Sequence, residues 1–175
     1  MDLKMYKRPI ALITVTGEKV RIVPGVLARL SQALADRMIN IYSVGTGEYS
    51  VTFAVDQADG KRAHEALSHV IIKDCAFDAV TMRENVAMIT ITGDEVAEQP
   101  GVLVRLTEPL AKKFINILGV SSSYDSLTIL VDWDDRDSSF KLIEGAFEKG
   151  ALVEYVKPEK AERARSPPPP PSVAQ

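Results

Sequence analysis

Hydrophobic and polar residues follow two different periods along the chain, and each change of period marks an expected element. Residues 11–16 and 87–92 are short, mostly apolar runs rich in β-branched residues, as in strands buried on both faces. Beyond each run, apolar residues recur every three or four positions, which predicts an amphipathic helix. These residues are Val26, Leu27, Leu30, Leu34 and Met38 in the first stretch, and Val102, Leu103, Leu106, Leu110 and Phe114 in the second. We expect Met38 and Phe114, which end the two rows, to lie in the core.

The two stretches are copies of one another. A shift of 76 positions, which carries Pro24 onto Pro100, superimposes VPGVLARL (23–30) on QPGVLVRL (99–106) without a gap. Roughly half of positions 11–59 are identical to their partners in the second copy, far more than chance allows in a chain of ordinary composition. The sequence therefore contains an internal duplication.

Each copy is predicted to contain strand, helix, strand, strand, helix and strand, in that order. After the first helices we expect strands over 39–46 and 115–122, strands over 49–56 and 125–132, helices over 59–71 and 136–149, and closing strands over 76–83 and 151–156. This order predicts a four-stranded antiparallel sheet with two helices on one face, the ferredoxin-like arrangement. We therefore predict an α+β protein of two βαββαβ domains, residues 10–84 and 85–157.

The last part of the chain, residues 158–175, differs in kind from the rest. It is rich in charged residues and then contains five consecutive prolines, which cannot join a helix or a central strand. This composition predicts a disordered tail, and the alternative is a docking segment for a proline-binding partner.

Charge and composition exclude several classes of function. The net charge is −3 and the basic residues are spread along the chain, which argues against a nucleic-acid partner. No apolar run reaches the eighteen or so residues that span a bilayer, so no membrane partner is expected. Cys75 is the only cysteine, and a reducing cytoplasm is the expected location. Without a phosphate loop or a paired nucleophile and base, we expect neither an enzyme nor a bound cofactor or metal.

The repeated Pro-Gly-Val motif places the first turn of a helix directly after a loop. Unsatisfied N–H groups and the positive end of the helix dipole suit a carboxylate there, and glycine lets a ligand approach the backbone. Amide side chains and hydroxyl-rich turns elsewhere in each copy suit the rest of an amino acid. The candidate ligand-binding residues are Pro24, Gly25, Val26, Asn40, Gly45, Thr46, Glu48, Gln99, Gly101, Val102, Asn116, Ser121 and Ser122. The alternative is that these features only start helices and shape turns.

The succession of these pieces resembles the ACT domain, a regulatory module that binds small molecules. The stretch INIYSVGTGEYSVTFAVD (39–56) carries the strongest likeness, because residues 45–48 fall on the family's Ser-Thr-Ser-Glu turn. Two copies in register over residues 10–156 look most like the tandem ACT domains in the regulatory part of aspartokinases. This resemblance implies an amino-acid effector, usually lysine or threonine, at an ACT–ACT interface. It also implies a homodimer and a catalytic partner such as an aspartokinase.

We therefore expect a non-catalytic regulatory protein or fragment that senses threonine or lysine. The first copy keeps Glu48 where the second has Tyr124, so the turn of the first copy is expected to form the better pocket, with the loop 98–101 and Asn116 contributed by the second copy. Lysine-binding copies of the family often carry an acidic residue where this chain has Tyr42 and Leu118, which makes threonine a rival to lysine. The alternative hypothesis is an ACT scaffold that mainly dimerises and docks, without a ligand.

Overall fold

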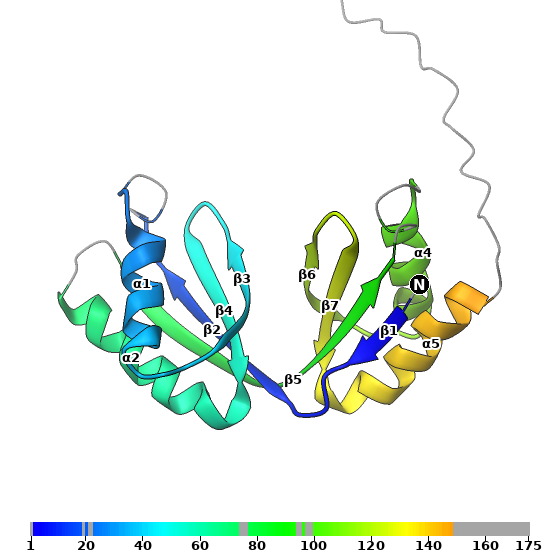
Figure 1. The fold of residues 1–175 in the computed structure, drawn as a ribbon, viewed down its shortest axis with the longest axis horizontal. Coiled ribbons are helices and arrows are strands. Elements are labelled where there is room, and N and C mark those ends of the chain that lie inside the picture. The colour runs from blue at the N-terminus through cyan, green and yellow to red at the C-terminus, as the bar shows by residue number, and fades with distance from the viewer. Residues whose placement is uncertain are drawn as a thin grey trace, which may run out of the picture.

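A computed structural model of the chain describes residues 2–18, 20, 23–73, 77–93, 96 and 100–148. Its strands and helices are β1 (Asp2–Met5), β2 (Ile10–Thr16), α1 (Val26–Ala35), β3 (Ile41–Thr46), β4 (Ser50–Asp56), α2 (Gly60–Lys73), β5 (Ala79–Thr92), α4 (Val102–Lys112), β6 (Ile117–Ser122), β7 (Ser126–Asp132) and α5 (Arg136–Glu148). Short 3-10 turns, Gln57–Asp59 and Trp133–Asp135, precede α2 and α5. Figure 1 shows two units side by side, each with its two helices on the outer face of its strands.

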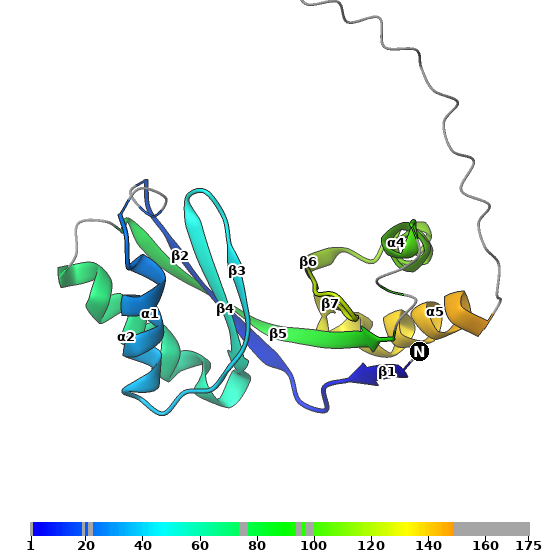
Figure 2. The same ribbon diagram turned by 45° about the horizontal axis from the view of Figure 1, so that its top comes forward.

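One seven-stranded antiparallel sheet runs through both units, with the strand order β3-β4-β2-β5-β7-β6 and β1 beside β5. The first half of β5 pairs with β2 through Ala79–Val86, and its second half pairs with β7 through Val86–Thr92. Figure 2 shows β5 continuing from the first unit into the second. The first unit comprises the elements from β2 to the first half of β5. The second unit comprises the elements from the second half of β5 to α5, together with β1. The predicted α+β, ferredoxin-like architecture is confirmed, with both units sharing one long strand.

The N-terminal strand β1 occupies the place of the fourth strand in the second unit. In the first unit that place belongs to the start of β5, where Ala79 pairs with Thr16. The residue equivalent to Thr16 in the second copy is Thr92, and its partner is Asp2 of β1. The predicted closing strand over 151–156 lies outside the described residues, as do Cys75 and the proline-rich segment 158–175.

Each unit has its own core between its helices and its sheet. Four of the periodic leucines of α1 and α4 are fully buried there, because they occupy one face of each helix: Leu30, Leu34, Leu106 and Leu110. Leu27 and Leu103 are partly exposed. The first core is centred on Ile13, Leu30, Leu34, Phe53 and Leu67, and the second on Ile89, Leu106, Leu110, Ile129 and Ile143.

The prediction that Met38 and Phe114 lie in the core is wrong. They are 89% and 97% exposed, with φ angles of 56° and 58°, because α1 and α4 end before them. The Met38 N–H donates to the Ala35 carbonyl, and the next N–H, of Ile39, donates to the Leu34 carbonyl. This is the Schellman ending of a helix, in which the left-handed position usually holds glycine. Phe114 takes the same position after α4.

Candidate functional site

The two Pro-Gly turns form left-handed helix starts that face open space. Gly25 and Gly101 have φ angles of 83° and 89°, and a Cβ built on either would meet no atom within 4 Å. The N-cap residues Gly25 and Gly101 have no side chain with which to cap α1 and α4, and neither helix has an acidic residue in its first turn. Val26 and Val102, the first residues of these helices, point into the two cores instead. Among the residues that the structure describes, no side chain therefore blocks the first N–H groups of either helix, and an anion can bind to them.

Within one unit, the structure separates the predicted residues into two groups. Pro24, Gly25 and the turn that holds Gly45, Thr46 and Glu48 lie at one end of the first unit, where α1 begins and the β3–β4 hairpin closes (Figure 1). Asn40 lies at the opposite end, exposed, just before β3 begins.

The second unit repeats this arrangement. Gly101 starts α4 and the exposed Ser121 and Ser122 end β6, whereas Asn116 precedes β6 at the other end. Gln99 lies outside the described residues. The predicted set therefore does not converge on one crevice inside a single unit.

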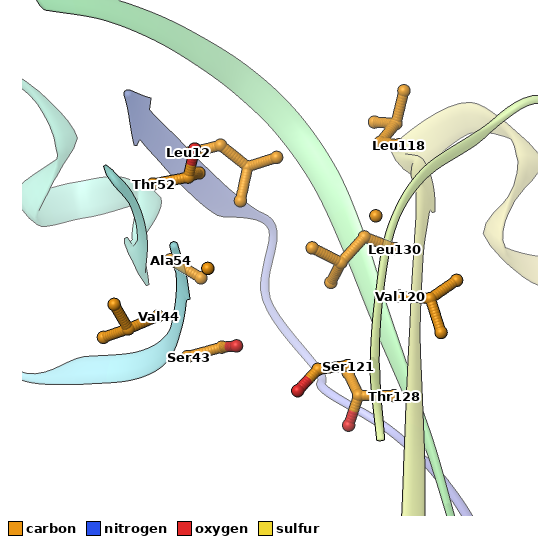
Figure 3. Close-up of a pocket in the computed structure, with 12 residues that line it drawn as sticks. Leu12, Ser43, Val44, Thr52, Ala54, Leu118, Val120, Ser121, Thr128 and Leu130 are labelled. Atoms are coloured by element: carbon orange, nitrogen blue, oxygen red, sulfur yellow. The ribbon is translucent and has the colours of Figure 1, made fainter. Parts of the chain in front are cut away.

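A groove of about 240 Å³ opens between the β3–β4 and β6–β7 hairpins, on the sheet face that carries no helix. Its walls come mostly from equivalent positions of the two copies, and Leu12 and Leu130 point towards each other from opposite sides (Figure 3). It is lined by Leu12, Ser43, Val44, Gly45, Thr52, Ala54, Leu118, Gly119, Val120, Ser121, Thr128 and Leu130. Of the predicted ligand residues, only Gly45 and Ser121 belong to this lining.

Sequence reasoning missed the threonines of this groove, although the duplication contained a signal. Thr52 and Thr128 are equivalent under the 76-residue shift and lie at alternate positions from the core residues of β4 and β7. The Thr52 hydroxyl is hydrogen-bonded to that of Thr14 at 2.8 Å, and the Thr128 hydroxyl to that of Thr90 at 3.0 Å. The walls of the groove therefore hold matched hydroxyl pairs above an apolar floor.

A polar cluster lies below the groove, where the chain passes between the units. The Tyr6 and Tyr42 hydroxyls are 2.6 Å apart, and Arg8 donates to the Tyr6 hydroxyl and forms a 2.8 Å ion pair with Asp56. The hydrogen bond with Tyr6, followed by burial, raises the pKa of Tyr42 to about 12. Tyr42 also packs in a small apolar cluster with Leu118 across the junction. Tyr42 and Leu118 thus pack against the junction, and neither side chain carries a carboxylate that could bind the ammonium group of lysine.

Two further classes of site are missing from the described residues. No three His, Cys, Asp or Glu side chains gather closely enough there to hold a metal ion. None of the helices in the same part of the chain is both long and apolar enough to cross a membrane.

Comparison with known proteins agrees with this arrangement. Two family models, each described as an ACT domain, match residues 13–70 and 81–144. The chain therefore belongs to the ACT domain family. It is 29% identical over 153 residues to the aspartokinase of Corynebacterium glutamicum, a match that covers 83% of this chain and 36% of that protein. The chain thus spans about a third of the length of the curated aspartokinases it matches.

Solved structures share the fold of the whole tandem pair. The regulatory subunit of aspartate kinase from Thermus thermophilus, solved in a ligand-free form, is 23% identical with a TM-score of 0.72. That similarity covers 83% of this chain and 95% of the subunit. Aspartokinase III of E. coli, solved in complex with lysine and aspartate, is 21% identical with a TM-score of 0.66, over 84% of this chain and 33% of that one. At these identities the likeness shows the fold.

Proposed function

We propose that this chain is a non-catalytic, amino-acid-binding regulatory module that controls an aspartokinase. Its effector is threonine or lysine, bound between ACT domains of two chains. The observation that carries the proposal is the pair of uncapped, left-handed glycine helix starts, one in each in-register copy. The similarity to aspartokinases, and to a separate regulatory subunit of aspartate kinase, supports the assignment of the partner enzyme.

The helix start supplies the chemistry for the α-carboxylate of the effector. The first N–H groups of α1 and α4 have no side-chain cap, and the dipole makes this end of the helix positive. Gly25 and Gly101 leave the approach open. Asn40 and Asn116 offer amide groups that can bind both a carboxylate and an amino group, but they lie at the far ends of their units.

A second chain can bring the two ends together. β3 and β6 lie at the two ends of the strand order β3-β4-β2-β5-β7-β6, and each runs from its asparagine towards the helix-start end of its unit. If β3 of one chain lies antiparallel to β6 of another, Asn40 comes beside the helix-start end of the partner's unit. The exposed apolar residues near these edges suit burial in such an interface: Leu27, Met38 and Val44 in the first unit, and Leu103, Phe114 and Val120 in the second. We therefore place the effector in a homodimer interface.

The test is a thermal-shift screen of the full chain against the amino acids, followed by calorimetry with threonine and lysine. An effector at a hundred times its dissociation constant adds about 2.7 kcal/mol of stability. That corresponds to a rise of several degrees in the melting temperature for a chain of this size.

Asparagine tolerates a left-handed backbone, so the Gly25→Asn and Gly101→Asn variants should fold while their side chains fill the approach to the helix start.

The two variants also report which copy binds. The copy that holds the effector should lose binding when its glycine is replaced, whereas the other variant should bind normally and serve as the matched control. Unchanged binding in both variants would refute the helix-start site. Replacing Glu48 by Gln should weaken binding of lysine and not of threonine if this carboxylate meets the ammonium side chain.

The second candidate function is a dimerisation and docking module without a ligand. Exposed Met38 and Phe114, both in a left-handed backbone conformation, favour it because they add apolar surface that a partner can cover. A flat screen together with a stable dimer would establish this alternative and exclude the effector proposal.

A further inference from the structure

The two units are joined by two backbone crossings within the described residues. One is the connection of residues 6–9 between β1 and β2, and the other is the middle of β5 around residues 84–86. Both crossings lie between the two units, below the β3–β4 and β6–β7 hairpins in the view of Figure 1. The angle between the units therefore depends on the backbone at these two places.

The crossing in β5 contains a bulge with a left-handed residue. Ile10 pairs with Val86 but Leu12 pairs with Arg83, so β5 has one residue more than β2 over this interval. Asn85 lies in the bulge with a φ angle of 58°. Bulges of this kind bend a strand and increase its twist, and asparagine is one of the few residues that adopts the left-handed conformation readily. The long strand is thus bent where it leaves the first unit.

One side chain, that of Gln57, is bonded to this bulge at two points. The Asn85 N–H donates to the Gln57 Oε1 at 2.6 Å, and the Gln57 Nε2 donates to the Asn85 Oδ1 at 3.2 Å. The backbone N–H of Gln57 also donates to the Pro9 carbonyl at 3.2 Å. Gln57 therefore contacts both crossings at once and holds the bulge in a defined conformation.

The neighbouring Asp56 fixes the position of Gln57. Its Oδ1 accepts a hydrogen bond from the Ala58 N–H at 3.0 Å, which caps the 3-10 turn that Gln57 begins. Its Oδ2 pairs with Arg8 of the first crossing. Asp56 is almost completely buried, whereas the Arg8 side chain and the Gln57–Asn85 bonds are exposed to solvent.

The second unit lacks this arrangement although it has the same fold. The residue equivalent to Gln57 is Trp133, which packs against the second core and carries Arg136 over its ring at 4.6 Å. The copies therefore differ at this position, although the turns of both units lie beside the β5 crossing: Asp132, just before the second turn, pairs with Val86 and forms a 2.8 Å ion pair with Arg83. The ACT fold alone does not require a glutamine there.

We propose that Gln57 is a positioning residue that sets the angle between the two ACT units. By bonding Asn85 and Pro9 together, it makes the bend at the junction a fixed one. A shift of one unit when an effector binds would then move the other unit as well. This transmission between the units rests on the proposed function, whereas the fixed angle between them does not.

The angle can be measured without any ligand. Spin labels at Glu65→Cys and Lys141→Cys, exposed and equivalent positions on α2 and α5, report the distance between the units by pulsed electron resonance in a Cys75→Ser background. Diluting the labelled chain with excess unlabelled chain removes distances between molecules. Gln57→Ala should broaden the distance distribution and shift its maximum, because both bonds to the bulge are lost.

Three variants make the test specific. Asn85→Gly keeps the left-handed backbone but removes the side-chain bond, and should broaden the distribution as well. Asn85→Asp keeps an acceptor for Gln57 Nε2, so this variant should have the same distance distribution as the wild type. Gln32→Ala removes a hydrogen bond to Asp36 on α1, away from the junction, and should change nothing.

A wild-type distance distribution in both Gln57→Ala and Asn85→Gly would overturn the proposal. If an effector is found, Gln57→Ala should leave its binding intact but abolish the change in distance that the effector produces. Failure of the ligand screen would contradict the proposed function and leave the distance measurement on the ligand-free chain as valid as before.

Discussion

Gly60, the first residue of α2, allows the helix to approach the central strand β2 closely. A Cβ at this position would lie 2.9 Å from the Ala11 Cβ and 3.4 Å from the Met82 Sδ. Carbon atoms prefer a separation of about 3.5–4.0 Å. Ala11 is fully buried, and its Cβ is fixed to the backbone of β2, so it cannot rotate away. Gly60→Ala must therefore push the helix and the strand apart.

The sign of the effect follows from two opposing contributions. Overpacking of this kind costs about 1–3 kcal/mol. Alanine offsets part of that cost, since it favours the helix over glycine by up to about 1 kcal/mol. We expect the free energy of unfolding to fall by about 1–2 kcal/mol. The melting temperature should fall by roughly 2–4 °C for each kcal/mol of stability that is lost.

Gly145 provides the matched control. It lies inside α5, where a Cβ would meet no atom within 4 Å. Gly145→Ala should therefore raise the free energy of unfolding by about 0.5–1 kcal/mol. Urea unfolding followed by far-ultraviolet circular dichroism measures both variants. If Gly60→Ala is as stable as the wild type or more stable, while Gly145→Ala is stabilised, the close contact between α2 and β2 does not constrain the fold.

Two further predictions concern Phe114 and Tyr42. Replacing Phe114 by Asn removes a bulky residue from a left-handed position and should raise the free energy of unfolding of the monomer by about 1 kcal/mol in a urea titration. The same change should weaken the proposed dimer in sedimentation, and an unchanged dimer would place Phe114 outside the interface. Tyr6→Phe should lower the pKa of Tyr42 from about 12 towards the ordinary value of 10.0, as seen by tyrosinate absorbance. Because folding raises this pKa, the stability it contributes is present below pH 10 and is lost between pH 10 and 12, so the variant should lose less stability over that interval. Equal losses in the wild type and the variant would contradict the role of Tyr6.

The sequence alone determined the two units and the start of each helix. Repetition after 76 residues and the change of hydrophobic period are local features, and they predicted α1, β3, β4, α2, α4, β6, β7 and α5 within a few residues. The Pro-Gly motifs likewise mark where the two helices start, but α1 and α4 begin at Val26 and Val102, two residues after the prolines, and the left-handed conformation of Gly25 and Gly101 was not predicted. These parts were predictable because backbone sterics and local burial decide them.

Only the tertiary structure decided how the pieces meet. No local pattern shows that β1 takes the fourth-strand place of the second unit, because strand pairing joins residues that are distant in the chain. The helical period that placed Met38 and Phe114 in the core stops where a Schellman ending turns the chain outward. Gln57 and Asn85 are 28 positions apart, so their contact exists only once β4 and β5 lie in one sheet. Pairing between distant strands brings such residues together, and a pattern of hydrophobic residues along the sequence does not predict which distant residues will meet.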